Sequence, residues 1–186
     1  MTEDDAELIK RWQHGDADAF EDLVRRWHDP VGRLLARLVG RADIAQDLNQ
    51  EVFLRVYRVG QSYQENGAFQ TWLYRIALNV ARDSGRRERR QPKSLDHYET
   101  ESGSASPDME CQQQELLDGV TKAVAELPEN SREVLVLRHY EDMSFAQMSR
   151  LLDVPASTLK SRFTVALRQL RVRLRQLGLL YGDTES

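Results

Sequence analysis

The feature that most constrains this chain is the segment from Met143 to Arg175, where two helical patterns flank a proline turn. Ser144 and Gln147 stand three residues apart, which is the spacing of a capping box at a helix start. Asp153-Val154-Pro155 ends that helix, because proline lacks an N–H and restrains the residue before it. The hydroxyls of Ala156-Ser157-Thr158 suit the start of a second helix. The segment therefore predicts a helix-turn-helix.

The second of these helices has an apolar face and a polar, basic face. We expect apolar residues at helical period to pack inward: Leu159, Phe163, Ala166, Leu167, Leu170, Leu174 and Leu177. We expect these residues to contact DNA: Ser157, Thr158, Lys160, Ser161, Arg162, Thr164, Val165 and Arg168. No acidic residue occurs from Val154 to Gly182, which favours a nucleic-acid partner. The alternative is ordinary packing in a helical bundle with a solvated basic face.

Composition limits the classes of protein to which the chain can belong. Its 186 residues, 40% hydrophobic and 30% charged, suit two small globular domains or one medium domain. The net charge of −4 means that nucleic-acid binding must rely on local basic patches. The single cysteine, Cys111, excludes an internal disulfide framework and fits a reducing compartment. Without a signal peptide or a membrane-length apolar run, the sequence predicts a cytoplasmic protein.

The remaining patterns predict an all-α protein with two helical domains. Residues 5–28 carry one or two helical patterns, and Pro30 suits the start of the next helix. Residues 91–111 are acidic, contain Ser, Pro and Gly, and lack an apolar period, which indicates a flexible linker. This linker divides the chain into an N-terminal domain, 1–90, and a C-terminal domain, 112–186, that holds the helix-turn-helix.

Residues 43–59 form a helix with a narrow apolar face and an unusual opposite face. There Leu54 stands among Asp47, Gln50 and Glu51. An apolar residue within a polar rim suits a protein partner, and an isolated surface leucine is the alternative.

The segment from Gln61 to Arg90 combines a polar loop, aromatic side chains and clustered arginines. Proteins that hold single-stranded nucleic acid stack aromatic rings on bases and place arginines along phosphates. The candidate contacts are Tyr63, Asn66, Phe69, Trp72, Tyr74, Asn79, Arg82 and Arg86. Among them we expect Phe69 and Trp72 to lie at least partly in the core. The better candidates for exposed contacts are Tyr63, Tyr74, Asn79 and Arg82.

No catalytic or metal-binding pattern is present in the sequence. The four histidines, His14, His28, His97 and His139, lack metal-ligand spacing with one another and with Cys111. There is no Gly-rich phosphate loop and no nucleophile elbow. The sequence therefore predicts no enzyme, no cofactor, no metal ion and no small-molecule substrate.

Three segments, taken in order, resemble a known family: DIAQDLNQEVFLRVYR at 43–58, GAFQTWLYRIALNVARD at 67–83 and LPENSREVLVLRHYEDMSFAQMSRLLDVPASTLKSR at 127–162. They resemble bacterial RNA polymerase sigma factors of the extracytoplasmic-function type, group 4 of the sigma-70 family. The resemblance covers nearly the whole chain. It implies a protein that binds core RNA polymerase and directs promoter recognition, DNA melting and transcription initiation.

The resemblance also implies a role for each candidate surface. Asp47, Gln50, Glu51 and Leu54 would bind the clamp of the polymerase largest subunit. The candidate contacts between Tyr63 and Arg86 would capture the melted non-template strand of the −10 element. Those between Ser157 and Arg168 would read the −35 element as duplex. The expected partners are core polymerase (clamp and flap), promoter DNA and an anti-sigma factor.

The chain departs from the family pattern at several positions of the helix-turn-helix. Many relatives carry a basic residue or an aromatic in place of Thr164 and Val165, and a basic residue in place of Leu167. We expect Thr164 and Val165 to lie toward the DNA and to alter the base preference at the upstream element, whereas the missing charge at Leu167, on the packed side, should cost little. Asp153 replaces the usual turn glycine and tolerates a positive φ better than most residues. The alternatives are a polymerase-independent helix-turn-helix regulator, and an enzyme or adaptor with an incidental helix-turn-helix.

Overall fold

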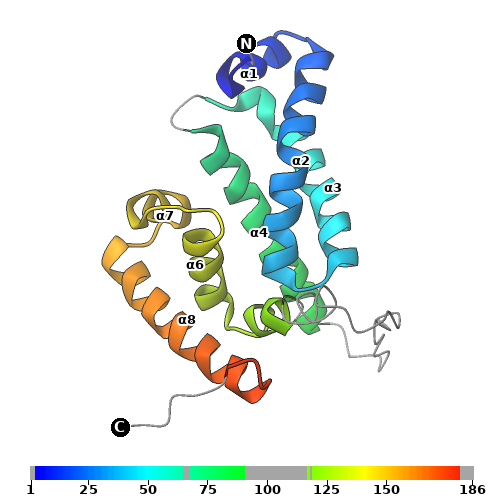
Figure 1. The fold of residues 1–186 in the computed structure, drawn as a ribbon. Helices are drawn as coiled ribbons and strands as arrows, with labels where there is room; N and C mark the ends of the chain where they lie inside the picture. Colours follow the sequence, from blue (N-terminus) through cyan, green and yellow to red (C-terminus); the bar gives the residue numbers. More distant parts are fainter. Residues whose placement is uncertain (1–2, 65–67, 91–116, 118, 181–186) are drawn as a thin grey trace.

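The structure is a computed structural model that describes residues 3–64, 68–90, 117 and 119–180. Within these ranges the chain folds into helices joined by short turns (Figure 1), which confirms the all-α class. The predicted linker, 91–111, lies outside the described residues. None of the described helices is long and apolar enough to cross a membrane.

The N-terminal helices are α1 (Asp5–Gln13), α2 (Ala17–Val39), α3 (Ala42–Val59) and α4 (Phe69–Arg90), with a 3-10 turn η1 (Gly60–Ser62) after α3. Asp4 and Asp16 cap the first two helices, and the Asp4 carboxylate accepts a hydrogen bond from the Glu7 N–H at 2.9 Å. The four helices bury a common apolar core that includes Leu8, Leu23, Leu34, Leu35, Val52 and Leu73.

The expected helix start at Pro30 is wrong, because α2 continues through this residue. Proline removes one backbone N–H, but Leu23, Val31 and Leu34 lie on one buried face that spans the proline. Packing of this face outweighs the lost hydrogen bond. The Asn49 amide of α3 also donates a hydrogen bond to the nearby His28 carbonyl at 3.0 Å and ties α3 to α2.

The C-terminal helices are α6 (Glu129–His139), α7 (Phe145–Leu152) and α8 (Ala156–Gln176), and residues 119–125 before them are also helical. The capping box of α7 is confirmed. The Ser144 hydroxyl accepts from the Gln147 N–H at 3.2 Å, and the Gln147 side-chain oxygen accepts from the Ser144 N–H at 2.8 Å. Asp153 takes the left-handed conformation, with φ 55°, at the turn that leads to α8.

The buried face of α8 is narrower than its sequence pattern predicts. Leu159 and Ala166 are buried, but Leu167 is 46% exposed and Leu177 is 51% exposed. The expectation that both leucines pack inward is therefore wrong. α8 lies at the outside of the molecule and packs against α6 and α7 on one side only (Figure 1).

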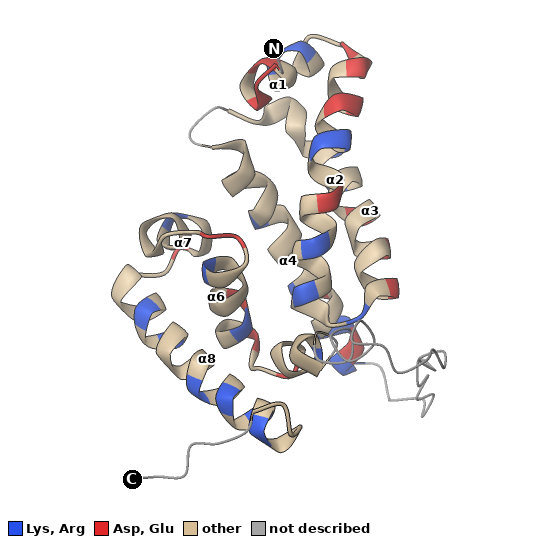
Figure 2. Cartoon of the chain, viewed as in Figure 1, with Lys and Arg blue, Asp and Glu red and all other residues tan. Residues whose placement is uncertain are grey.

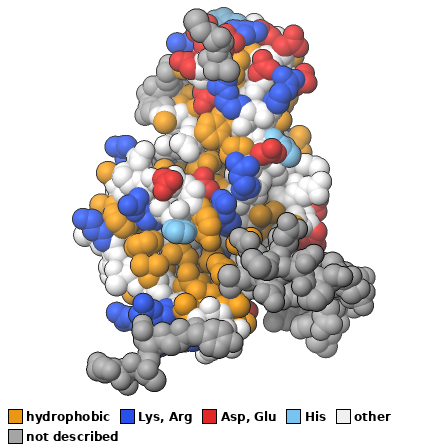
Figure 3. Space-filling model, in the orientation of Figure 1, with side chains coloured by type: hydrophobic (Ala, Val, Ile, Leu, Met, Phe, Trp, Pro, Cys, Tyr) orange, Lys and Arg blue, Asp and Glu red, His pale blue; other side chains and the backbone are white. Residues whose placement is uncertain are grey.

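Helix α6 is buried on all of its sides along its central turn. Every residue from Glu133 to Leu137 is buried, although consecutive positions point in different directions around a helix. This happens because α6 contacts both α8 and α2, so it lies between the C-terminal and N-terminal helices. On the face drawn in Figure 3, apolar side chains gather over the C-terminal helices.

Candidate functional site

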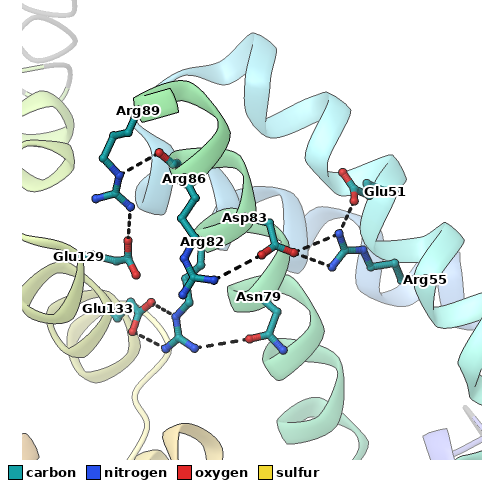
Figure 4. A network of polar contacts seen from close by, with 10 residues as sticks. Glu51, Arg55, Asn79, Arg82, Asp83, Arg86, Arg89, Glu129 and Glu133 are labelled. Atoms are coloured by element: carbon teal, nitrogen blue, oxygen red, sulfur yellow. Dashed lines mark hydrogen bonds and ion pairs between the residues drawn. The ribbon is translucent and has the colours of Figure 1, made fainter. Parts of the chain in front are cut away.

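The surface of α3 presents the predicted protein-binding residues. Asp47, Gln50 and Leu54 are exposed, and Leu54 is 57% exposed. Glu51 is half-buried and accepts a hydrogen bond from Arg55 at 2.5 Å. Arg55 also donates to Asp83 of α4 at 3.2 Å, which fixes the orientation of α3 against α4 (Figure 4). The result is an apolar side chain on a rigid, polar-rimmed helix face.

Three aromatic rings cluster where η1 leads toward α4. The ring centroids of Tyr63 and Trp72 are 4.8 Å apart, and those of Phe69 and Trp72 are 5.6 Å apart. Phe69 is buried, as expected for a core ring, whereas Tyr63 and Trp72 are half-buried. Gln13 donates hydrogen bonds to the Gly60 and Tyr63 carbonyls, both at 2.9 Å, and so fixes the backbone of residues 60–63 next to the cluster.

A cavity of about 350 Å³ opens beside this aromatic cluster, and its walls include Tyr63, Thr71, Trp72 and Arg75. It combines ring surface with hydroxyl groups and one exposed guanidinium. Such a lining suits a planar group that carries a nearby negative charge. Asn66, a further predicted contact, lies outside the described residues.

Tyr74 is not exposed, and the expectation that it lies on the surface is wrong for this structure. Its side chain is 1% exposed, and its ring meets that of Trp27 edge-on at 6.1 Å. Its hydroxyl donates a hydrogen bond to Glu141 at 2.6 Å. Burial, together with this carboxylate, raises the pKa of the Tyr74 hydroxyl, so the group remains a donor.

The predicted DNA contacts Asn79, Arg82 and Arg86 of α4 differ in their exposure to solvent. Asn79 and Arg86 are exposed, whereas Arg82 is half-buried. Arg82 makes a bidentate contact with Glu133 of α6, with N–O distances of 2.6 and 2.7 Å (Figure 4). Hydrogen bonding to this carboxylate raises the pKa of Arg82. The structure therefore places two of the predicted DNA contacts, Tyr74 and Arg82, against the C-terminal helices.

Helix α8 presents the predicted duplex-reading residues to solvent. Arg162 is half-buried, and the others are exposed: Ser157, Thr158, Lys160, Ser161, Thr164, Val165 and Arg168. Val165 is 40% exposed, which leaves an apolar contact point within a polar surface. Figure 2 shows Lys and Arg along α8 and no acidic residue on it. This short row of polar, basic and apolar groups suits a major groove.

Sequence reasoning missed several residues that join the two sets of helices. Arg75 donates to the carbonyls of Arg150 and Leu151 at the end of α7, at 2.6 and 3.3 Å. Arg37 donates to Glu141 at 3.3 Å. No local signal in the sequence indicates these contacts, because their partners are far away along the chain.

The part of the chain that the structure describes contains no candidate metal site. Over those residues, no group of three or more His, Cys, Asp or Glu side chains lies close enough together to hold a metal ion.

Comparison with known proteins gives matches over both sets of helices. The family model for Sigma-70 region 2 matches residues 23–91, and that for Sigma-70, region 4 matches residues 117–170. The chain is 32% identical over 183 residues to the ECF RNA polymerase sigma-E factor of Haemophilus influenzae, covering 93% of this chain and 96% of the relative. It is 35% identical over 168 residues to the ECF RNA polymerase sigma-E factor of Escherichia coli, covering 85% of this chain and 87% of the relative.

Two solved structures share this fold. One is CnrH in complex with the cytosolic domain of CnrY, with a TM-score of 0.69 and 20% identity, covering 92% of this chain and 97% of that one. The other is the sigma factor RpoE in complex with the anti-sigma factor NepR from Bartonella quintana. Its TM-score is 0.64 at 20% identity, covering 84% of this chain and 96% of that one.

Proposed function

Because the chain belongs to the ECF RNA polymerase sigma factors of the sigma-70 family, we propose that it binds core RNA polymerase and directs promoter recognition, DNA melting and transcription initiation. The observation that carries this proposal is the occurrence of three suitable surfaces on one chain, in the family's order: the α3 face, the aromatic cluster with α4, and the outer face of α8. The proposed division into domains 1–90 and 112–186 follows these surfaces.

For the polymerase, we propose that the α3 face formed by Asp47, Gln50, Glu51 and Leu54 binds the clamp of the largest subunit. An exposed leucine with a polar rim is the composition of a protein-interface anchor. The ion pairs of Arg55 with Glu51 and Asp83 support this role, because they hold the helix in one orientation before binding.

For the −10 element, we propose that the aromatic cluster and α4 hold the melted non-template strand. A base that leaves the stack would enter the cavity beside Tyr63 and Trp72, and ring stacking would offset the unstacking energy. Asn79, Arg82 and Arg86 would follow the backbone of the same DNA strand.

For the −35 element, we propose that α8 enters the major groove. Lys160 and Arg168 would contact phosphates or base edges, and Val165 would contact a thymine methyl group. Thr164 and Val165 are the positions where we expect this chain's own base preference to be determined. Replacing both with arginine should change which promoters the polymerase uses, and unchanged promoter choice would refute this assignment.

The family also supports proposals about regulation and location. We propose that an anti-sigma factor binds this chain, as NepR binds the RpoE sigma factor whose fold the chain shares. We propose further that the protein acts in the cytoplasm with the polymerase, and that it catalyses no reaction of its own.

Reconstitution with core RNA polymerase tests the proposal directly. The purified chain should co-elute with core polymerase in size-exclusion chromatography, and the holoenzyme should start transcripts at a small set of genomic promoters in vitro. Sequencing the 5′ ends of these transcripts would give the two promoter elements. A chain that neither co-elutes nor supports initiation, yet binds specific duplex DNA alone, would instead be a polymerase-independent regulator.

A further inference from the structure

A second cavity lies between α1, α2 and the start of α4, and the proposed function does not use it. Its volume is about 510 Å³, which is within the range of small-molecule sites. We call it the α1 cavity, and its lining includes Asp4, Asp5, Gln13, Trp27, Tyr63 and Phe69. Phe69 is buried in its wall, and Trp27 and Tyr63 are half-buried there. The cavity is therefore a preformed space with aromatic walls and a few polar groups.

The hydrogen-bond donors around the α1 cavity are already engaged, whereas acceptors remain. The Gln13 amide donates to two backbone carbonyls, both at 2.9 Å. The Trp27 indole N–H donates to Asp5 at 3.2 Å, and Lys10 is not free either. Among the described residues, Gln13 Oε1 and Asp4 Oδ2 receive no hydrogen bond, because the helix cap uses Asp4 Oδ1. A ligand that fits must therefore donate hydrogen bonds.

The charges at this end of the molecule favour a cation and disfavour DNA. Asp4 and Asp5 line the cavity, and Glu7 adds a further carboxylate to the first turn of α1 (Figure 2). The rings of Trp27 and Phe69 add aromatic surface, which attracts cations through its π-face. The same carboxylates repel the phosphates of a DNA strand. The ligand that fits is a planar organic cation, such as an aryl amidine or an aryl amine.

The α1 cavity shares a wall with the cavity proposed for the DNA base, because Tyr63 and Ala68 line both. The two cavities differ in charge, since Arg75 lines the base cavity and Asp4 lines the α1 cavity. The Tyr63 ring lies 4.8 Å from that of Trp72, centroid to centroid. A ligand in the α1 cavity would fill the space beside Tyr63 and so hold its ring against Trp72.

We propose that the α1 cavity binds a planar organic cation, and that this ligand strengthens binding of the melted DNA strand on the other side of Tyr63. The second part of this inference rests on the proposed function of the aromatic cluster. By thermodynamic linkage, the strand would strengthen ligand binding by the same factor. The chain would then carry an effector site that adjusts promoter opening.

Binding is tested with benzamidine and with benzoate, a planar anion of similar size, by NMR titration of the isotope-labelled full-length chain. The indole N–H signals report separately, because Trp27 lines the α1 cavity, Trp72 lines the base cavity and Trp12, which is 3% exposed, serves as the reference. Benzamidine should shift the Trp27 signal with a Kd of about 1 mM, as expected for so small a ligand. Benzoate should leave the Trp27 signal unchanged.

Two variants locate the site, and a third is the matched control. Asp4→Asn keeps the cap of α1 but removes the charge, and should weaken benzamidine binding by about three- to fivefold. Ala6→Phe places a ring in the wall of the cavity and should abolish binding. Glu7→Gln removes the same charge from the same helical turn, outside the described lining, and should bind as the wild type does. Circular dichroism establishes that each variant is folded.

Fluorescence anisotropy with a labelled oligo-dT strand measures the effect of the ligand on strand binding. Benzamidine hydrochloride is compared with sodium chloride at equal ionic strength, because strand binding depends on salt. Benzamidine should tighten strand binding by about threefold in the wild type, since the strand then meets a Tyr63 ring that is already held in place. It should have no effect in Ala6→Phe.

An unchanged Trp27 signal, or equal shifts with benzamidine and benzoate, would overturn the cation site. Undiminished benzamidine binding in both Asp4→Asn and Ala6→Phe would overturn its location. Binding of benzamidine without tighter strand binding would overturn the link between the two cavities. A failure of the proposed function is distinct from these results, because the strand would then not bind even without benzamidine, while the Trp27 shift would remain.

Discussion

Leu54→Ala tests the α3 face as a polymerase-binding surface. Leu54 is 57% exposed in the free chain, so its removal leaves no cavity in the core. Its exposed area becomes buried only when a partner covers it. The variant should therefore keep the stability of the wild-type chain and lose affinity for core RNA polymerase.

The size of the loss follows from the area that is available. Burial of a whole leucine side chain contributes about 1.5–3 kcal/mol. With 57% of the side chain available to the partner, the contribution is roughly 1–2 kcal/mol, and alanine retains part of it. We expect the Kd for core polymerase to rise by about five- to tenfold.

Anisotropy titration of a dye-labelled chain with core polymerase measures this Kd, and thermal unfolding measures stability. Val59→Ala is the matched control, because Val59 lies on the same helix, is 47% exposed and points in a different direction from Leu54. A Leu54→Ala chain that binds polymerase as tightly as the Val59→Ala chain would refute the assignment of this face.

Three further predictions concern the local structure. Ser144→Ala removes one half of the capping box of α7 and should lower the free energy of unfolding by about 1 kcal/mol in urea titration, and no change would contradict the cap. Asp153→Gly relieves a φ of 55° and should raise that free energy by roughly half a kcal/mol, so a loss would show that the Asp153 side chain stabilises the turn. Asp16→Asn keeps the cap of α2 but weakens the pairing with Arg11, which holds the pKa of the Asp16 carboxyl below its ordinary value of 3.8. Because the ionised carboxylate stabilises the folded state, its contribution is present above pH 3.8 and is lost as the pH falls through the lower folded pKa. The variant should therefore melt below the wild type at neutral pH and approach it in acid, and a difference that persists in acid would exclude the ion pair as its cause.

Features that depend on neighbouring residues could be predicted from the sequence. The capping box of Ser144 and Gln147 and the turn at Asp153 formed as expected, because their geometry is set within a few residues. The exposure of Leu54 could also be predicted, since its neighbours on that helix face are polar.

Features that depend on distant packing could not be predicted in this way. Tyr74 has the sequence context of a surface residue but is buried, because Glu141 approaches it from the turn after α6, 67 residues further along the chain. Pro30 resembles a helix start but lies within α2, because the core on both sides of it keeps the helix continuous. Leu167 lies at the edge of the apolar face of α8. It is exposed because α6 and α7 cover only one side of α8.

The burial of Glu133 has a consequence for competition inside a cell that contains several sigma factors and a limited supply of core polymerase. Glu133 of α6 pairs with Arg82 of α4, and α6 packs against α2, so any separation of these helices during holoenzyme assembly reduces the free energy of assembly by that of the contact. A substitution of Glu133 would therefore shift the abundance at which the chain displaces its competitors, without altering a residue that we propose to touch polymerase or DNA. Natural variation at such a position would retune the threshold of a transcriptional response while leaving its target genes the same.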